Sequence, residues 1–151
     1  MIFDRLFRIL VVCVATPFLW AGGAMGQEQG TPEQAQAMAE AAAAYFQAEG
    51  AEAAFEAFNT GEQFHDRDLY VFAIDREGVM VAHGANQNLV GRNVLDMRDP
   101  NGVQLFHEFL AVEDAGWVDY QWPHPQTGAV QDKTSYIINV GEYAIGVGAY
   151  K

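Results

Sequence analysis

Large side chains with polar tips crowd residues 116–136, GWVDYQWPHPQTGAVQDKTSY. A buried Trp or Tyr brings a donor that must find a hydrogen-bond partner, whereas Leu or Ile would fill a core without that demand. On a strand over residues 117–122, Tyr120 and Trp122 share one face and Trp117 lies on the other. So many polar-tipped aromatic side chains around one turn suggest a binding pocket.

Lys133 begins a strand directly opposite the aromatic one, and Tyr136 lies on that same strand. A Lys ammonium amid Tyr hydroxyls and Trp indole N–H groups supplies the charge-assisted donors that a buried carboxylate requires in a low-dielectric site. An aromatic core with Lys133 extending its ammonium past the rim fits the same residues. The pattern leaves both interpretations open.

His83 ends a strand run and opens onto a glycine-rich loop that starts at Gly84. It has the same strand parity as Val79 and Val81, which would let its side chain point into a pocket at the sheet edge. A lone histidine is more often a hydrogen-bonded structural residue. Parity alone does not choose between these two roles.

Catalytic and metal-binding patterns are weak in this sequence. It contains no GxSxG nucleophile elbow, no glycine-rich phosphate loop after a strand and no pair of histidines at zinc spacing. The turn at residues 96–102 resembles a calcium loop, but Met97 would occupy the first ligand position and cannot ligate calcium. We therefore expect neither an enzyme nor a bound metal or cofactor.

The composition favours one globular domain with a substantial core. The chain has 151 residues, of which 50% are hydrophobic and 13% aromatic, so it does not read as a disordered segment. Its formal net charge of −12 argues against partners such as nucleic acid or an anionic membrane surface, because both are polyanions. A small anionic ligand remains compatible, since it responds to the local field of a pocket.

Residues 1–26 read as a signal peptide for export to the periplasm or the medium. Two arginines precede an apolar run at residues 9–20, and small residues before Gln27 suit a cleavage site. The alternative is a retained membrane anchor, but the run is short for a span and Pro17 interrupts it. Cys13, the single cysteine, lies inside the signal, so the exported protein is expected to need no disulfide.

The remaining chain predicts an α+β domain with one antiparallel sheet of about five strands. Residues 27–34 form a short mobile lead and the start of a helix, and residues 35–151 form the single domain. Thr31 and Gln34 match a capping box for a helix that Gly50 breaks. Two runs of helix formers and five strand runs follow from periodicity, with the helices at 31–58 and 103–115 and the strands at 69–74, 79–83, 117–122, 133–140 and 143–150.

Several motifs occur in an order that resembles single Cache domains of the second type, which are extracytoplasmic ligand-sensing modules of bacterial chemoreceptors and sensor kinases. The motifs are DLYVFAIDREGVMVAHGANQNLVGRN, DPNG, GWVDYQWPHPQTGAVQDKTSY and VGAY, and the match runs from about Ala35 to the end. The resemblance implies a long N-terminal helix packed on a PAS-like antiparallel sheet. It also implies that six residues lie at or near a pocket for a small organic acid such as acetate, propionate, pyruvate or lactate: His83, Trp117, Tyr120, Trp122, Lys133 and Tyr136.

Two departures from the family pattern shape the expectation for this chain. Gly84 stands where the family commonly has Pro after the histidine, and the chain ends at Lys151, where family receptors continue into a membrane helix and an output domain. We therefore expect a stand-alone exported sensor that acts through a membrane-bound sensor or transporter, with homodimerisation through the N-terminal helix as a further expectation. The alternative is a ligand-free accessory subunit of such a membrane protein.

Overall fold

The computed structural model describes residues 28–151. The predicted signal peptide at residues 1–26, with Cys13 in it, lies outside the described residues. Within residues 28–151, no helix combines the length and the apolar character needed to cross a membrane.

The N-terminal helices form as their capping residues predict. Helix α1 (Pro32–Glu49) starts after Thr31, whose hydroxyl accepts the Gln34 N–H while the Gln34 side chain accepts the Thr31 N–H. Gly50, with φ at 86°, ends α1, and α2 (Ala51–Thr60) follows at once. A positive φ suits glycine because it has no Cβ to clash with the backbone. The predicted helix, break and second helix are confirmed.

Six antiparallel strands form the sheet in the order β1-β2-β6-β5-β4, with β3 pairing to β2. The predicted meander at the end of the chain is confirmed, and a two-residue strand is added at the start. The strands are β1 (His65–Asp66), β2 (Leu69–Asp75), β3 (Met80–His83), β4 (Ala115–Pro123), β5 (Val130–Val140) and β6 (Tyr143–Tyr150).

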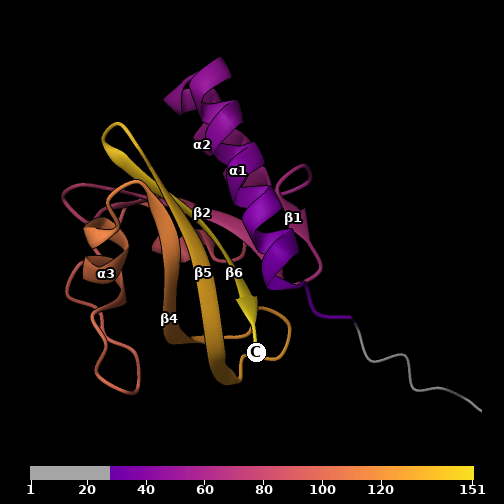
Figure 1. Cartoon of the computed structure of the whole chain (residues 1–151), viewed down its shortest axis with the longest axis vertical. Coiled ribbons are helices and arrows are strands. Elements are labelled where there is room, and N and C mark those ends of the chain that lie inside the picture. The colour runs from indigo at the N-terminus through magenta and orange to yellow at the C-terminus, as the bar shows by residue number, and fades with distance from the viewer. Residues whose placement is uncertain (1–27) are drawn as a thin grey trace, which may run out of the picture.

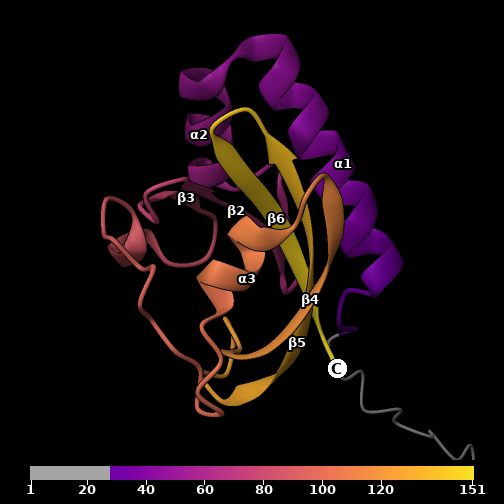
Figure 2. The same ribbon diagram turned by 60° about the vertical axis from the view of Figure 1, so that its left-hand side comes forward.

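The sheet lies between two unlike layers (Figures 1 and 2). Helices α1 and α2 cover one face, here called the helix face, where small residues such as Ala35, Ala39 and Ala42 are fully buried. The opposite face, here called the loop face, is covered by α3 (Leu105–Ala111) and by residues 84–104, which include the 3-10 helix η1 (Gln87–Leu89). Alanines let α1 pack close to the sheet, whereas the loop face is filled mainly by aromatic rings.

Candidate functional site

Lys133 is buried on the loop face. Its side chain is among the fully buried ones, with 1% of the residue exposed. Its Cα partners are Tyr120 on β4 and Tyr150 on β6. The neighbouring strand leaves room for the stem at Gly148, where an added Cβ would lie 2.3 Å from Lys133 Cε. The sheet is thus built to hold a lysine inside rather than at its rim.

The ammonium of Lys133 is surrounded by phenols instead of carboxylates. Lys133 Nζ donates to the hydroxyl of Tyr70 at 2.8 Å and, more weakly, to that of Tyr150 at 3.5 Å. It also lies over both rings, 4.2 and 4.6 Å from their centroids, which is a cation–π geometry. Among residues 28–151, no Asp or Glu oxygen lies within 4.0 Å of this amine. Burial lowers the pKa of Lys133 to about 7, and the charge of Asp68 works in the opposite direction.

Tyr120 and Ser135 form a second polar pair next to this lysine. The Tyr120 hydroxyl and Ser135 Oγ are 2.7 Å apart, and both residues are buried. Burial raises the pKa of Tyr120, so its phenol stays neutral. The Tyr120 ring also makes an edge contact with Trp122, at 6.2 Å between centroids. A hydroxyl pair of this kind can turn either oxygen toward a bound ligand as donor or acceptor.

His83 is buried on the loop face by a bulge in β3. The β2–β3 register shifts between Ala73 and Ile74, so Val81 has no partner and Met80 and His83 share a face. The predicted alternation of Val79, Val81 and His83 is therefore broken, although His83 does point to the cavity side. One extra residue in a strand is enough to invert the parity of everything before it.

The hydrogen bonds of His83 define which ring nitrogen can serve a ligand. His83 Nδ1 accepts the backbone N–H groups of Asn86 at 2.9 Å and Ala85 at 3.3 Å, so the ring proton lies on Nε2. Burial and, secondarily, the charge of Lys133 lower the pKa of His83 to about 3. The ring therefore stays neutral and keeps one N–H donor.

A small cavity lies between these side chains and α3. The space open to the centre of a water molecule is about 10 Å³, close to what one ordered water requires. The side chains with polar tips that line the cavity are Tyr70, His83, Tyr120 and Trp122. The apolar side chains that line it are Phe72, Met80, Leu105, Phe106 and Phe109. Lys133 is not part of this wall, but its ammonium contacts the hydroxyl of a wall residue, Tyr70.

A larger hollow of about 210 Å³ lies beside the cavity. The two share Tyr70, His83 and Trp122, so these three side chains separate the outer space from the inner one. The outer hollow adds Asn86, His124 and two prolines to its lining.

Two of the six residues predicted for the site lie elsewhere. Trp117 and Tyr136 are cross-strand partners whose rings pack at 5.0 Å. Tyr136 packs against the core of the helix face, and Trp117 is 42% exposed. The other four residues, His83, Tyr120, Trp122 and Lys133, are brought together on the loop face.

Sequence reasoning missed three residues that contact this group. Tyr70, Ser135 and Tyr150 lie within the predicted strand runs, and their hydroxyls bond to Lys133 or Tyr120. The two-residue turn at 141–142 could have identified Tyr150, because a tight turn fixes the register of the two strands that it joins. With Val140 paired to Tyr143, the same register places Lys133 opposite Tyr150.

The architecture defines an α+β domain with a PAS-like antiparallel sheet and a small polar and aromatic cavity under its loop-covered face. A Cache domain family model matches residues 33–151, and the chain belongs to this family. The resemblance seen in the sequence motifs is thereby confirmed.

Curated relatives match part of this chain. The chain is similar to the sensor histidine kinase MctS of Rhizobium johnstonii, at 31% identity over 57% of this chain and 20% of that protein. It is also similar to the methyl-accepting chemotaxis protein McpP of Pseudomonas putida, at 36% identity over 57% of this chain and 17% of that protein. The chain therefore spans about a fifth of the length of these relatives, which are signalling proteins.

A solved structure shares the fold. It is a Cache chemosensory domain whose structural basis for carboxylic acid recognition has been described, and it has 24% sequence identity and a TM-score of 0.66 to this chain. The match covers 78% of this chain and 91% of that one. The likeness establishes the architecture of helix, sheet and loop layer.

Proposed function

We propose that this protein is an extracytoplasmic binding module for a small organic acid such as acetate, propionate, pyruvate or lactate. The observation that carries the proposal is the buried ammonium of Lys133, which has only phenols as partners among residues 28–151. A buried charge is costly unless it is paired. A ligand carboxylate would supply the missing counter-charge.

The groups around Lys133 suit a carboxylate with a short tail. The N–H of His83, the hydroxyl of Tyr120 and the ammonium of Lys133 are donors of the kind that two carboxylate oxygens accept. The phenylalanines of the cavity would contact the tail. Because the cavity is small, a bound acid has few carbons and its entry moves a wall side chain such as Trp122. Few ligand atoms also limit affinity, so we expect dissociation constants in the range of about micromolar.

The carboxylate assignment agrees with what is known of a relative, the Cache chemosensory domain described as recognising carboxylic acids. Since the curated relatives are a sensor kinase and a chemoreceptor, we propose that this domain signals through a membrane-bound sensor or transporter. Its proposed location is outside the cytoplasm, after removal of residues 1–26, with residues 35–151 as the working domain and the N-terminal helix as a homodimer contact.

A second candidate function is a ligand-free accessory subunit. It is favoured by one observation: the cavity as it stands admits about one water molecule. In that case the domain would contact a partner protein without binding a ligand. The buried lysine would then only favour one packing of the core over others.

A thermal-shift titration with acetate, propionate, pyruvate and lactate separates the two functions. The binding module predicts a rise in Tm with at least one acid in the wild-type protein, and none in Lys133→Met. Lys151→Met is the matched control, since this lysine is exposed and pairs with Asp119; it should respond like wild type. A folded wild-type protein that none of the acids stabilises would leave the accessory role as the better assignment.

A further inference from the structure

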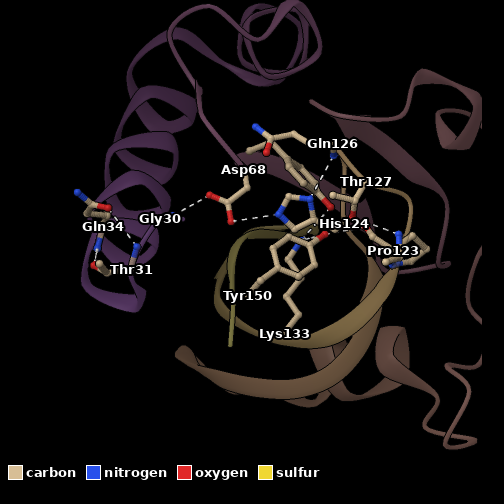
Figure 3. Close-up of polar contacts among 12 residues, drawn as sticks. Gly30, Thr31, Gln34, Asp68, Pro123, His124, Gln126, Thr127, Lys133 and Tyr150 are labelled. Atoms are coloured by element: carbon tan, nitrogen blue, oxygen red, sulfur yellow. Dashed lines mark hydrogen bonds and ion pairs between the residues drawn. The ribbon is translucent and has the colours of Figure 1, made fainter. Parts of the chain in front are cut away.

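Asp68 is a buried acid that fastens the chain segment leading into α1. It lies in the turn between β1 and β2 and is 1% exposed. Asp68 Oδ1 accepts a hydrogen bond from the Gly30 N–H at 2.7 Å (Figure 3). Gly30 immediately precedes Thr31, the N-cap of α1. One carboxylate oxygen thus holds the residue that precedes the N-cap of α1.

Gly30 is also packed directly on the sheet. A Cβ at this position would lie 2.2 Å from Leu69 Cγ, which is far inside contact distance. The segment predicted to be mobile is therefore docked at Gly30 by a buried hydrogen bond and by close backbone packing. We call residues 28–31 the lead.

The second oxygen of Asp68 faces the candidate site. Asp68 Oδ2 is buried without a hydrogen-bond partner, and it lies 3.7 Å from Nε2 of His124. His124 Nδ1 accepts the Gln126 N–H at 3.2 Å, so its ring proton is on Nε2, toward Asp68. Figure 3 shows Asp68 with the lead on one side and His124 on the other.

Aromatic contacts continue this line to the buried lysine. The rings of His124 and Tyr150 pack at 4.6 Å between centroids. The Tyr150 hydroxyl donates to the carbonyl of Pro123 at 2.7 Å and accepts from Lys133 Nζ at 3.5 Å. Asp68 and Lys133 are thus opposite buried charges that are linked through two rings but do not touch.

We propose that Asp68 is a positioning residue that couples carboxylate binding at Lys133 to the docking of the lead on the sheet. This inference rests on the proposed function of the site. The charge of Asp68 favours the protonated form of Lys133, so the two buried charges attract each other, and the carboxylate of Asp68 is a charge-assisted acceptor for the Gly30 N–H. A ligand carboxylate beside Lys133 cancels that attraction and repels Asp68. Binding therefore loosens the lead at the start of α1.

The coupling is reciprocal, because two sites that share a free energy affect each other equally. A variant that undocks the lead should bind the acid more tightly, and so should a variant that removes the charge of Asp68. The affinity is best compared at about pH 6, below the wild-type pKa of about 7 for Lys133, because removal of the Asp68 charge lowers this pKa further.

Hydrogen exchange of a peptide that contains residues 28–31 tests this coupling in the full chain. In wild type, saturating propionate or pyruvate should speed exchange about fivefold, at the low end of allosteric coupling. In Asp68→Asn the exchange should already be fast and should no longer respond to either acid. Asp66→Asn is the matched control, as an exposed acid at the end of β1 beside the same turn, and it should respond like wild type.

Lys133→Met allows the coupling to be tested without any ligand, because it removes the ammonium that the ligand carboxylate would neutralise. Removal of the ammonium should speed exchange of the lead in the wild-type background but not in Asp68→Asn. If exchange is unchanged by Lys133→Met, or if the acid response persists in Asp68→Asn, the coupling is overturned. If no acid binds and yet Lys133→Met loosens the lead only when Asp68 is present, the proposed function fails and the coupling stands.

Gly30→Ala tests the same coupling by perturbing the lead instead of the charge of Asp68. This variant replaces Asp68→Asn in the test if Asp68→Asn does not fold. Its methyl group collides with Leu69 and undocks the lead without touching a charge. The affinity for propionate or pyruvate, measured by calorimetry, should rise about fivefold. An unchanged affinity in a folded Gly30→Ala protein, with a lead that exchanges fast, would contradict the proposal.

Discussion

Replacement of Lys133 by Met should make the ligand-free protein more stable while it abolishes acid binding. Burial lowers the pKa of Lys133 from 10.5 to about 7. Each pKa unit corresponds to about 1.4 kcal/mol, so the protonated amine costs the folded state on the order of 5 kcal/mol below pH 7. Met has a similar shape and no charge. It leaves the Tyr70 hydroxyl without its donor, which costs about 1–3 kcal/mol, so the net gain should be about 2–4 kcal/mol.

The pH dependence of the wild-type protein carries the same signature. Between pH 7 and 10.5 the unfolded chain holds the lysine proton while the folded one has lost it. The stability therefore rises with pH in this window, and the penalty is fully present below pH 7. From about pH 6 to 9.5 the free energy of unfolding should increase on the order of 3 kcal/mol through this group. The raised pKa values of Tyr70, Tyr120 and Tyr150 act only at higher pH.

Urea unfolding of wild type, Lys133→Met and Lys151→Met at both pH values measures this effect. The difference between Lys133→Met and wild type should shrink as the pH rises. Lys151→Met should track wild type within a few tenths of a kcal/mol, because its exposed pair with Asp119 contributes little. The reasoning is wrong if Lys133→Met is less stable than wild type at both pH values, or if the pH slope of wild type survives in it.

Three further expectations follow from single contacts. The affinity for propionate, measured by calorimetry, should fall as the pH rises above about 7, because the amine loses its proton; a constant affinity from pH 6 to 9 would mean that Lys133 does not pair with the acid. Trp117→Ala should leave the affinity unchanged within about twofold, since this residue is exposed on the other face; a tenfold loss would return it to the site. Gly146→Ala should destabilise the protein by about 1–3 kcal/mol in urea, since its methyl group would lie 2.5 Å from Phe72. Gly116→Ala should cost little, since its methyl group would make an ordinary contact of 3.6 Å with Val112.

The elements of the fold were predictable because their signals are local. Thr31, Gln34 and Gly50 mark the bounds of the first helix by capping and by a positive φ. The strands of the meander, β4, β5 and β6, were predictable from the glycines in the turns between them and from the alternation of their side chains. The short strand β1 was not predicted, since two residues carry no periodicity. The pairing of β6 with β2 was not predicted, because it joins strands that are far apart in the chain and has no local signal.

The site was only partly predictable because it depends on which face each residue takes. Lys133 and Tyr136 are three residues apart in one strand, so they point to opposite faces, and parity alone would have separated them. For His83, parity alone was misleading. The bulge at Val81 changes which residues of β3 share a face with His83, and no Gly or Pro in the sequence marks this bulge. Asp68 and His124 meet from distant parts of the chain. Their contact depends on tertiary packing and has no signal in the sequence.

The most direct test of the central claim is a crystal structure of the full chain grown with whichever acid raises the Tm most. We expect a carboxylate oxygen within hydrogen-bonding distance of Lys133 Nζ, a second contact to His83 or Tyr120, and the tail against the phenylalanines of the cavity. A cavity without the acid, or an acid bound on the helix face near Trp117, would contradict it.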